Sequence, residues 1–449
     1  MKLLAASLIL LSLSLCALAE TGVSLTVYNQ NLALVRDTRK MTFPKGKGEV
    51  QFRDVSAQID ATSVHFKAGG VQMLEQNFDY DLVSPDKLLQ KYVDQKIEIV
   101  SKTGAVTRGT LLTAQAQPSN QIVVRQDDGT LKSILMSDNV AEIRYPTLPE
   151  GLITKPTLRW LVNSDGSGDK EAEVSYLTTG LEWKADYVML LNEPNTRADL
   201  DAWVTLDNTS GASYQNAKLK LIAGSVHRVQ PPQMPMPMMD RMVKSAAPER
   251  QFEEQSFFEY HLYTLQRPTD ILNNQTKQVS LFPSTTAGIK KVYTYDWQAN
   301  KDRVGVSAEF ENTEANGLGM ALPGGRVRVY QKSADGSQEF VGEDSMEHTP
   351  KNEKVTVTIG NAFDIAAEHN QTNFRRISDR VMETDFEVKL RNHKKEAVQV
   401  VVVDHLWGDW EITRSSTEYK KVSANKVEFR VTVEPEHEFS LTYTVRTTS

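Results

Sequence analysis

Alternation of apolar and polar residues is the feature of this sequence that most limits its fold. Valine, leucine, isoleucine, tyrosine or phenylalanine occupies every second position in residues 218–221, 326–329, 355–359, 427–433 and 439–445. Because side chains of a strand point alternately to its two faces, each stretch predicts a β-strand with one face on a core and one in water. Turn-forming pairs separate the stretches at Asp128-Gly129, Ser210-Gly211, Asn316-Gly317 and Asp335-Gly336. We therefore predict a mainly β protein of antiparallel β-sandwich modules with little helix.

The N-terminus reads as a secretory signal peptide. A basic start, Met1-Lys2, precedes an apolar run over residues 3–15 and the small-residue site Ala17-Leu18-Ala19. The apolar run is shorter than the ~20 residues that a membrane-spanning helix needs. We predict that residues 1–19 are removed, that the protein is periplasmic or secreted, and that no transmembrane segment remains. Removal of Cys16, the single cysteine, would exclude disulfides and thiolate chemistry.

Signal cleavage can be tested directly. We expect intact-mass analysis or N-terminal sequencing of exported protein to find Glu20 as the first residue. Recovery of Met1, or of a chain lipidated at Cys16, would contradict the assignment to the periplasm or the medium.

A small barrel is predicted over residues 84–148. Ser84 suits a helix N-cap, with Pro85 at the first helical position and Asp86 in the first turn. Five short strands are predicted after this helix, at 96–101, 109–114, 121–125, 131–135 and 140–144. A helix followed by five compact strands is typical of SH3-like or Sm-like barrels, and we interpret it as a packing insertion.

A segment rich in methionine and proline divides the rest of the chain. Alternating prolines prevent regular structure, so residues 230–256 predict a flexible linker. Its closely spaced thioethers could also bind Cu(I), a soft ion, through Met234, Met236, Met238 and Met239. The full prediction is a signal peptide (1–19), an N-terminal β module (20–83), the barrel (84–148), a β-sandwich segment (149–229), the linker (230–256) and a C-terminal β-sandwich region (257–449).

One cluster of residues is a candidate binding site. Acids, a histidine and two tryptophans gather where an apolar strand over residues 400–403 ends, at Asp404, His405, Trp407, Asp409 and Trp410. They could line a pocket for a small molecule or a sugar. The other interpretation is that the tryptophans cap a sandwich core while the Gly-Asp pair turns the chain.

Known catalytic and cofactor motifs are missing from the sequence. It holds no Gly-x-Ser-x-Gly elbow, phosphate loop, dinucleotide fingerprint or His-Glu-x-x-His motif, so we predict no catalytic residues and no cofactor. With 51 Lys and Arg against 58 Asp and Glu, the net charge of -7 does not favour a nucleic-acid partner.

Three segments carry a resemblance to a known family. They are residues 27–36 (VYNQNLALVR), 174–187 (VSYLTTGLEWKADY) and 206–211 (LDNTSG). With them the chain resembles an uncharacterised family of exported bacterial proteins, whose C-terminal part is similar to the domain of unknown function in mucoidy-inhibitor A-like proteins. The resemblance implies a multi-module, mainly β extracytoplasmic protein and supplies no catalytic residues. The chain lacks the long coiled-coil insertion of the mucoidy inhibitors.

Three functions follow from these patterns. The first is a non-catalytic binding or scaffold protein of the bacterial envelope, which meets an envelope protein or glycan through sheet edges and exposed loops. The second is a carbohydrate-active or hydrolytic enzyme that uses the acids around Trp407 and Trp410. The third is a copper-handling protein that uses the methionines of residues 234–242.

Overall fold

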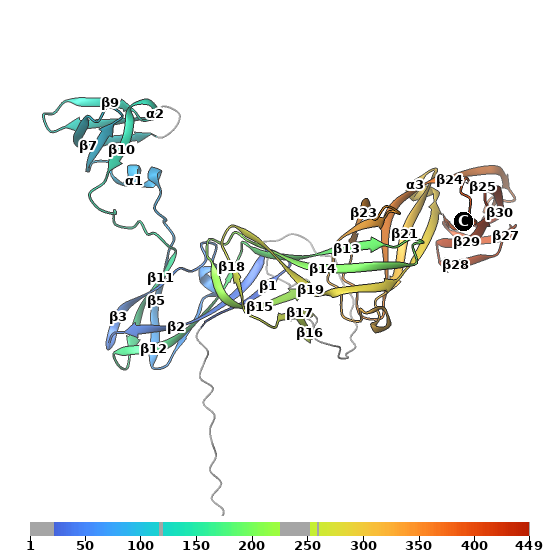
Figure 1. Ribbon diagram of the computed structural model, residues 1–449, viewed down its shortest axis with the longest axis horizontal. Coiled ribbons are helices and arrows are strands. Elements are labelled where there is room, and N and C mark those ends of the chain that lie inside the picture. Colours follow the sequence, from blue (N-terminus) through green and yellow to red (C-terminus); the bar gives the residue numbers. More distant parts are fainter. Residues whose placement is uncertain (1–21, 116–119, 225–251, 258–259, 449) are drawn as a thin grey trace, which may run out of the picture.

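The computed structural model describes residues 22–115, 120–224, 252–257 and 260–448, and it is built almost entirely of β-strands. Figure 1 shows an elongated molecule, with a small module near one end and the C-terminal strands at the other. The described strands form five sheets. The few helices are short: α1 (Pro85–Lys91), α2 (Met136–Asn139), α3 (Trp297–Asn300), and the 3₁₀ turns η1 (Ala61–Ser63) and η2 (Glu314–Asn316).

Two sheets pack face to face in the N-terminal half. The larger has the strand order β16 (Phe252–Phe257), β17 (Tyr260–Leu265), β15 (Tyr214–Ala223), β1 (Gly22–Tyr28), β2 (Leu32–Phe43), β12 (Gly168–Thr178) and β4 (His65–Ala68), with β18 (Thr269–Ile271) beside β15. The smaller consists of β3 (Gly46–Arg53), β11 (Thr157–Ser164) and β5 (Val71–Asp79). Trp160 on β11 fills the space between them against Phe52 and Phe66.

A central sheet continues the same hydrophobic core. Its order is β19 (Gln275–Gly288), β14 (Arg197–Asn208), β13 (Leu181–Leu191), β22 (Gly325–Lys332) and β23 (Gln338–Met346). Alternate residues of β13, including Trp183, Tyr187 and Met189, are buried in this core, as their period-2 spacing predicts.

The largest sheet forms the C-terminal end of the molecule (Figure 1). Its order is β27 (Asp409–Ser415), β30 (Glu438–Thr448), β25 (Val381–Asn392), β24 (Lys354–Arg376), β21 (Arg303–Glu311), β20 (Lys290–Asp296), β26 (Val398–His405), β29 (Lys426–Val433) and β28 (Tyr419–Ser423). The long strand β24 belongs to two cores, because Val355 and Val357 join the central core while Ile365 and Ala367 join a separate C-terminal core. β24 therefore links the central core to the C-terminal core.

The insertion has its own core and the predicted helix and strands. Ser84 caps α1 by accepting a hydrogen bond from the backbone N–H of Lys87, and the five strands are β6 (Lys96–Ser101), β7 (Val106–Gln115), β8 (Gln121–Gln126), β9 (Leu131–Leu135) and β10 (Val140–Arg144). The sheet order is β10-β6-β7-β8-β9. Among the described residues no ladder joins β9 to β10, so the predicted closed barrel is wrong. Bulges in β7 and at the start of β10 curl the sheet, and α2 carries the chain from one edge to the other.

Most described strand pairs are antiparallel, as predicted, but the sheets are not purely antiparallel. β1 pairs with β15, β13 with β22, and β20 with β26 in parallel, so three of the sheets are mixed. Alternation along a strand shows which of its faces is buried. It does not show which strand pairs with it, so the parallel neighbours could not be predicted from the sequence. β16 begins at Phe252, inside the segment predicted as a linker. Phe252 is buried and pairs with Leu265 of β17.

We expect the excised insertion, residues 84–146, to fold on its own. Its core residues, such as Leu89, Ile97, Leu111 and Ile122, form a cluster separate from the rest of the molecule. The fragment should give a β-type circular-dichroism spectrum and a cooperative thermal transition. An unfolded fragment, obtained while the remainder of the chain stays folded, would show that the boundary is misplaced.

Candidate functional site

The candidate residue Asp404 lies at the end of β26 and points into the C-terminal core. It follows Val400 and Val402 at period 2, which puts its side chain on the buried face, and only 2% of the residue is exposed. The carboxylate is satisfied there: Oδ1 accepts from Trp297 Nε1 at 3.0 Å and from the His405 backbone N–H at 2.8 Å, and Oδ2 accepts from the Tyr443 hydroxyl at 2.6 Å. Three donors thus compensate the burial of this carboxylate.

The hydrogen bonds fix the protonation of a neighbouring histidine. A tyrosine hydroxyl has one proton, and Tyr443 donates it to Asp404, so its oxygen accepts from His369 Nε2, 3.2 Å away. This arrangement requires a proton on Nε2 of His369. Burial lowers the pKa of His369, although the charge of Asp404 opposes the shift. Burial also raises the pKa of Tyr443 well above its usual value, so Tyr443 remains a donor.

Helix α3 covers this network from the solvent side. Trp297 stacks on the His369 ring with centroids 4.6 Å apart, and it is 37% exposed. Asp296 caps α3 by accepting from the backbone N–H groups of Gln298 and Ala299, and its Oδ2 lies 2.9 Å from Nε2 of the candidate residue His405. No sequence signal pointed to Trp297, His369 or Tyr443. Each is more than 70 residues from the next along the chain, and only the folding of the sheet brings them together.

The other three candidate residues do not join Asp404 and His405 in one pocket. Trp410 is only 6% exposed and donates from Nε1 to the backbone carbonyl of Ala424, with Lys421 Nζ 4.1 Å from its ring centroid. This is the core-capping role considered above. Trp407, by contrast, is 70% exposed, and Asp409 is exposed as well. The cluster is therefore divided between the core and the surface.

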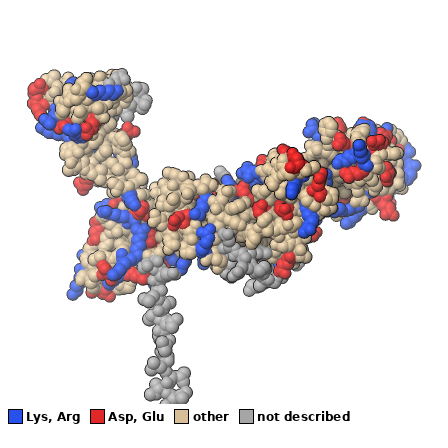
Figure 2. Space-filling view, viewed as in Figure 1, with Lys and Arg blue, Asp and Glu red and all other residues tan. Residues whose placement is uncertain are grey.

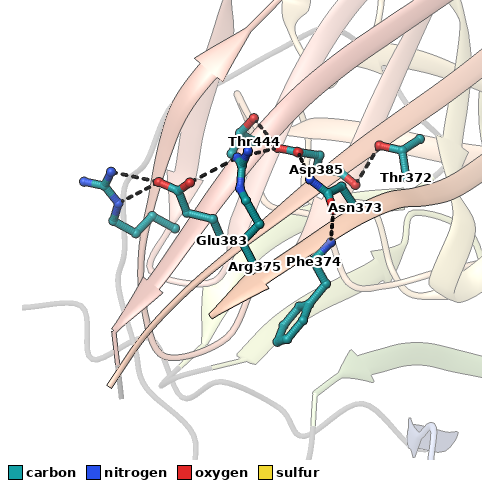
Figure 3. A network of polar contacts seen from close by, with 8 residues as sticks. Thr372, Asn373, Phe374, Arg375, Glu383, Asp385 and Thr444 are labelled. Carbon is teal, nitrogen blue, oxygen red and sulfur yellow. Dashed lines mark hydrogen bonds and ion pairs between the residues drawn. The ribbon is translucent and has the colours of Figure 1, made fainter. Parts of the chain in front are cut away.

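A second polar network lies on the outer face of the same sheet (Figure 3). Glu383 accepts hydrogen bonds from Arg446 at 2.8 Å and from Arg375 at 3.1 Å, while Asp385 accepts from Thr444 at 2.7 Å. The Arg446 hydrogen bond is the main cause that lowers the pKa of Glu383, and the Thr444 hydrogen bond is the main cause for the lowered pKa of Asp385. These pairs bind β24, β25 and β30 together.

A groove of about 980 Å³ lies in the described part of the chain, and we call it the junction groove. It lies where the turn between β13 and β14 (residues 193–195) approaches β20, β26 and β29, at the junction of the central and C-terminal sheets. Alternate residues of three neighbouring strands form its floor, with Thr294, Val401 and Arg430 in one row across the sheet. The lining is mostly polar and charged.

A small apolar pocket of about 140 Å³ adjoins the junction groove, since Asn195 and Lys291 line both. Its apolar walls come from the two sheets: Leu191, Ile289, Val306, Ala308, Val341 and Ile359. Acidic and basic side chains are interleaved over the face of the C-terminal strands that Figure 2 shows. The groove and the pocket lie where two sheets meet, and concave features at such junctions are candidates for ligand binding.

The metal prediction lies outside what the structure describes. Met234, Met236, Met238 and Met239 fall in the part of the chain without description, as do residues 1–19 of the predicted signal peptide. In the described ranges, no three His, Cys, Asp or Glu side chains are grouped to hold a metal ion. No helix in those ranges is long and apolar enough to cross a membrane.

We expect acid to destabilise the C-terminal sheet through His369. Because burial lowers its pKa in the folded protein, the neutral form stabilises the fold above the unfolded pKa of about 6.5, and this contribution is lost as pH falls from there through the folded pKa. Thermal melts between pH 7.5 and pH 5 should therefore show a falling midpoint. His369→Gln should flatten this dependence, whereas His437→Gln, at an exposed histidine, should not. An unchanged slope in His369→Gln would contradict the assignment.

Fold and site together define a class: a mainly β protein of mixed and antiparallel sheets, in which the candidate acid Asp404 is buried and engaged in internal hydrogen bonds. Within this class, the family model "Domain of unknown function (DUF4139)" matches residues 172–448, and the chain belongs to that family. The match confirms the predicted resemblance of the C-terminal part to this domain. No curated protein matches the chain.

Proposed function

We propose that this protein is a non-catalytic binding or scaffold protein of the bacterial envelope, periplasmic or secreted, and that the junction groove is its ligand site. The observation that carries the proposal is the groove itself, a concavity of about 980 Å³ with an apolar pocket beside it, where two sheets meet. Ligand sites favour such interfaces and combine an apolar compartment with a few polar groups that set orientation.

The enzyme alternative has less support from the geometry. A glycosidase needs two carboxylates that face one cleft about 5 to 10 Å apart. Asp404 is buried and accepts hydrogen bonds on both carboxylate oxygens. Asp409, two residues after Trp407 in the chain, is exposed. Asp404 and Asp409 therefore do not form such a pair facing solvent. The copper alternative rests on methionines outside the described residues and stays a prediction.

A pull-down from envelope extracts tests the binding role without assuming a ligand. The immobilised full-length mature protein should retain an envelope component that the same matrix without protein does not retain. The double variant Lys290→Glu/Lys291→Glu, which reverses two charges of the junction groove, should lose that component. Failure of the wild-type protein to retain any component in repeated extracts would contradict the proposal.

A further inference from the structure

The solvent-facing side of the eight-stranded sheet is rich in basic and hydroxyl side chains. The strand registers arrange it in three rows: Lys218, Ser24, Arg36, Ser175 and His65; then Thr264, Lys220, Thr26, Leu34 and Leu177; then Gly22, Thr38, Glu173 and Lys67. We call these three rows the basic face. The residues that alternate with them, such as Leu25, Val35 and Val174, are buried in the core, so the rows lie on the opposite side of the sheet.

The basic face has a positive local charge. Its four lysine and arginine side chains stand against one acid, Glu173, which gives +3 with His65 neutral. Lys40, Glu171 and Asp169 continue the same side of the sheet beyond the third row, and their one cation and two acids leave +2. The whole chain has a net charge of -7, so this positive charge is specific to the basic face.

Three of the four cations have no ion-pair partner. In the described part of the chain, no carboxylate lies within 4 Å of Arg36, Lys67 or Lys220. An arginine on the outer face of the C-terminal sheet shows the contrast, because Arg446 lies 2.8 Å from Glu383. The cations of the basic face lack such neutralisation and can meet an external anion.

Hydroxyl groups lie between the cations. Ser24 and Ser175 flank Arg36 in its row, and Thr26 is next to Lys220 in the second row. The hydroxyls of Ser24, Thr26 and Ser175 form no hydrogen bond with any described residue, and all three side chains are partly exposed. They can therefore exchange hydrogen bonds with water or with the hydroxyls of a ligand.

This combination suits an acidic polysaccharide better than a nucleic acid or a lipid surface. Nucleic-acid surfaces use aromatic side chains to stack bases, and the three rows contain no phenylalanine, tyrosine or tryptophan. Attachment to a lipid surface needs exposed apolar side chains, and the apolar side chains of these rows, Leu34 and Leu177, are both half-buried. Cations and free hydroxyls match the acid and hydroxyl groups of a glycan.

The spacing of the cations indicates a linear polymer that crosses the strands. Lys218 on β15 and Arg36 on β2 are two strands apart, which is about 10 Å. Lys67 on β4 is two strands beyond Arg36, so the cations extend over about 19 Å. An extended chain with repeated anionic groups can meet all of them in turn.

We propose that the basic face binds a linear acidic polysaccharide, with anionic groups beside Lys218, Arg36 and Lys67 and hydroxyls on the serines between them. The inference goes beyond the binding function above, because it concerns a second surface on another sheet and does not depend on the junction groove. Charge complementarity supplies the attraction, so binding should weaken as salt is added.

Titration of the protein with fluorescent oligogalacturonate at low ionic strength tests this proposal. We expect saturable binding that weakens at least tenfold in Arg36→Gln/Lys220→Gln. The matched control Arg380→Gln/Lys420→Gln removes one exposed arginine and one exposed lysine from the C-terminal sheet and should change binding less than twofold. Glu173→Gln removes the one acid of the basic face, so it should tighten binding at least twofold.

Methyl esterification of the probe removes its charge and keeps its backbone, so the ester should not bind. Equal binding of the ester would overturn the proposal. So would unchanged binding by Arg36→Gln/Lys220→Gln with a wild-type circular-dichroism spectrum, or an equal loss in the control variant. Tighter binding of a single-stranded oligonucleotide or of phosphatidylglycerol vesicles would overturn the choice of a glycan. The pull-down component that depends on the junction groove should be retained by Arg36→Gln/Lys220→Gln, so failure of this proposal leaves that function standing.

Discussion

Trp160→Ala should lower the free energy of unfolding by about 3 to 5 kcal/mol, the range for removal of a large aromatic side chain from a packed core. Trp160 is completely buried, with its ring centroid 4.9 Å from that of Phe66 and 5.7 Å from that of Phe52. Its Nε1 also donates to the side-chain oxygen of Gln76 at 2.9 Å, so truncation leaves a cavity and an unpaired acceptor. Urea unfolding followed by circular dichroism measures the change.

Trp407→Ala is the matched control for this variant. Trp407 is 70% exposed, so the same substitution should change the unfolding free energy by less than about 0.5 kcal/mol. Similar effects at both positions would mean that the three-stranded sheet does not pack on the eight-stranded sheet as described.

Asp404→Ala should destabilise the C-terminal sheet by about 2 to 4 kcal/mol. The substitution leaves the buried Tyr443 hydroxyl and the partly exposed Trp297 indole N–H without their acceptor, and an unpaired buried group costs about 1 to 3 kcal/mol. Calorimetry of the protein should show an earlier transition. Asp409→Ala, at an exposed carboxylate, should leave that transition in place.

A titration of His369 by NMR gives Asp404 a second, independent readout. The charge of Asp404 raises the pKa of His369, so Asp404→Asn should lower that pKa further while keeping the side-chain volume. An unchanged pKa would show that the Asp404, Tyr443 and His369 side chains are not connected, whatever the stability of the variant.

Local structure was predictable where neighbouring residues decide it. The first turn of α1 follows from Ser84 and Pro85, and β6, β9 and β10 have the predicted bounds because alternation and turn residues delimit them. Burial of Asp404 also had a sequence signal, since the residue continues the alternation of Val400 and Val402 on the inner face. That alternation favours a position in the core over a site that faces solvent.

Pairing and long-range contacts were not predictable from the same patterns. The parallel neighbours β13 and β22 are separated by more than 130 residues, and period 2 carries no information on which strand lies beside which. The junction groove combines the turn at 193–195, β20, β26 and β29, and none of these segments has an unusual composition. The sheet of the insertion does not close into the predicted barrel. The number of strands does not specify whether the two edge strands, β9 and β10, pair with each other.

Site-specific photocrosslinking in living cells tests the binding function most directly. A photoreactive amino acid at Gln399, exposed on the groove floor, should give one dominant adduct with a cell-envelope component after illumination. The adduct should be lost when Lys291→Gln is added, and the same amino acid at Lys420 on β28 should not form it. Absence of any adduct from Gln399, or the same adducts from Gln399 and Lys420, would contradict a binding protein that uses the junction groove.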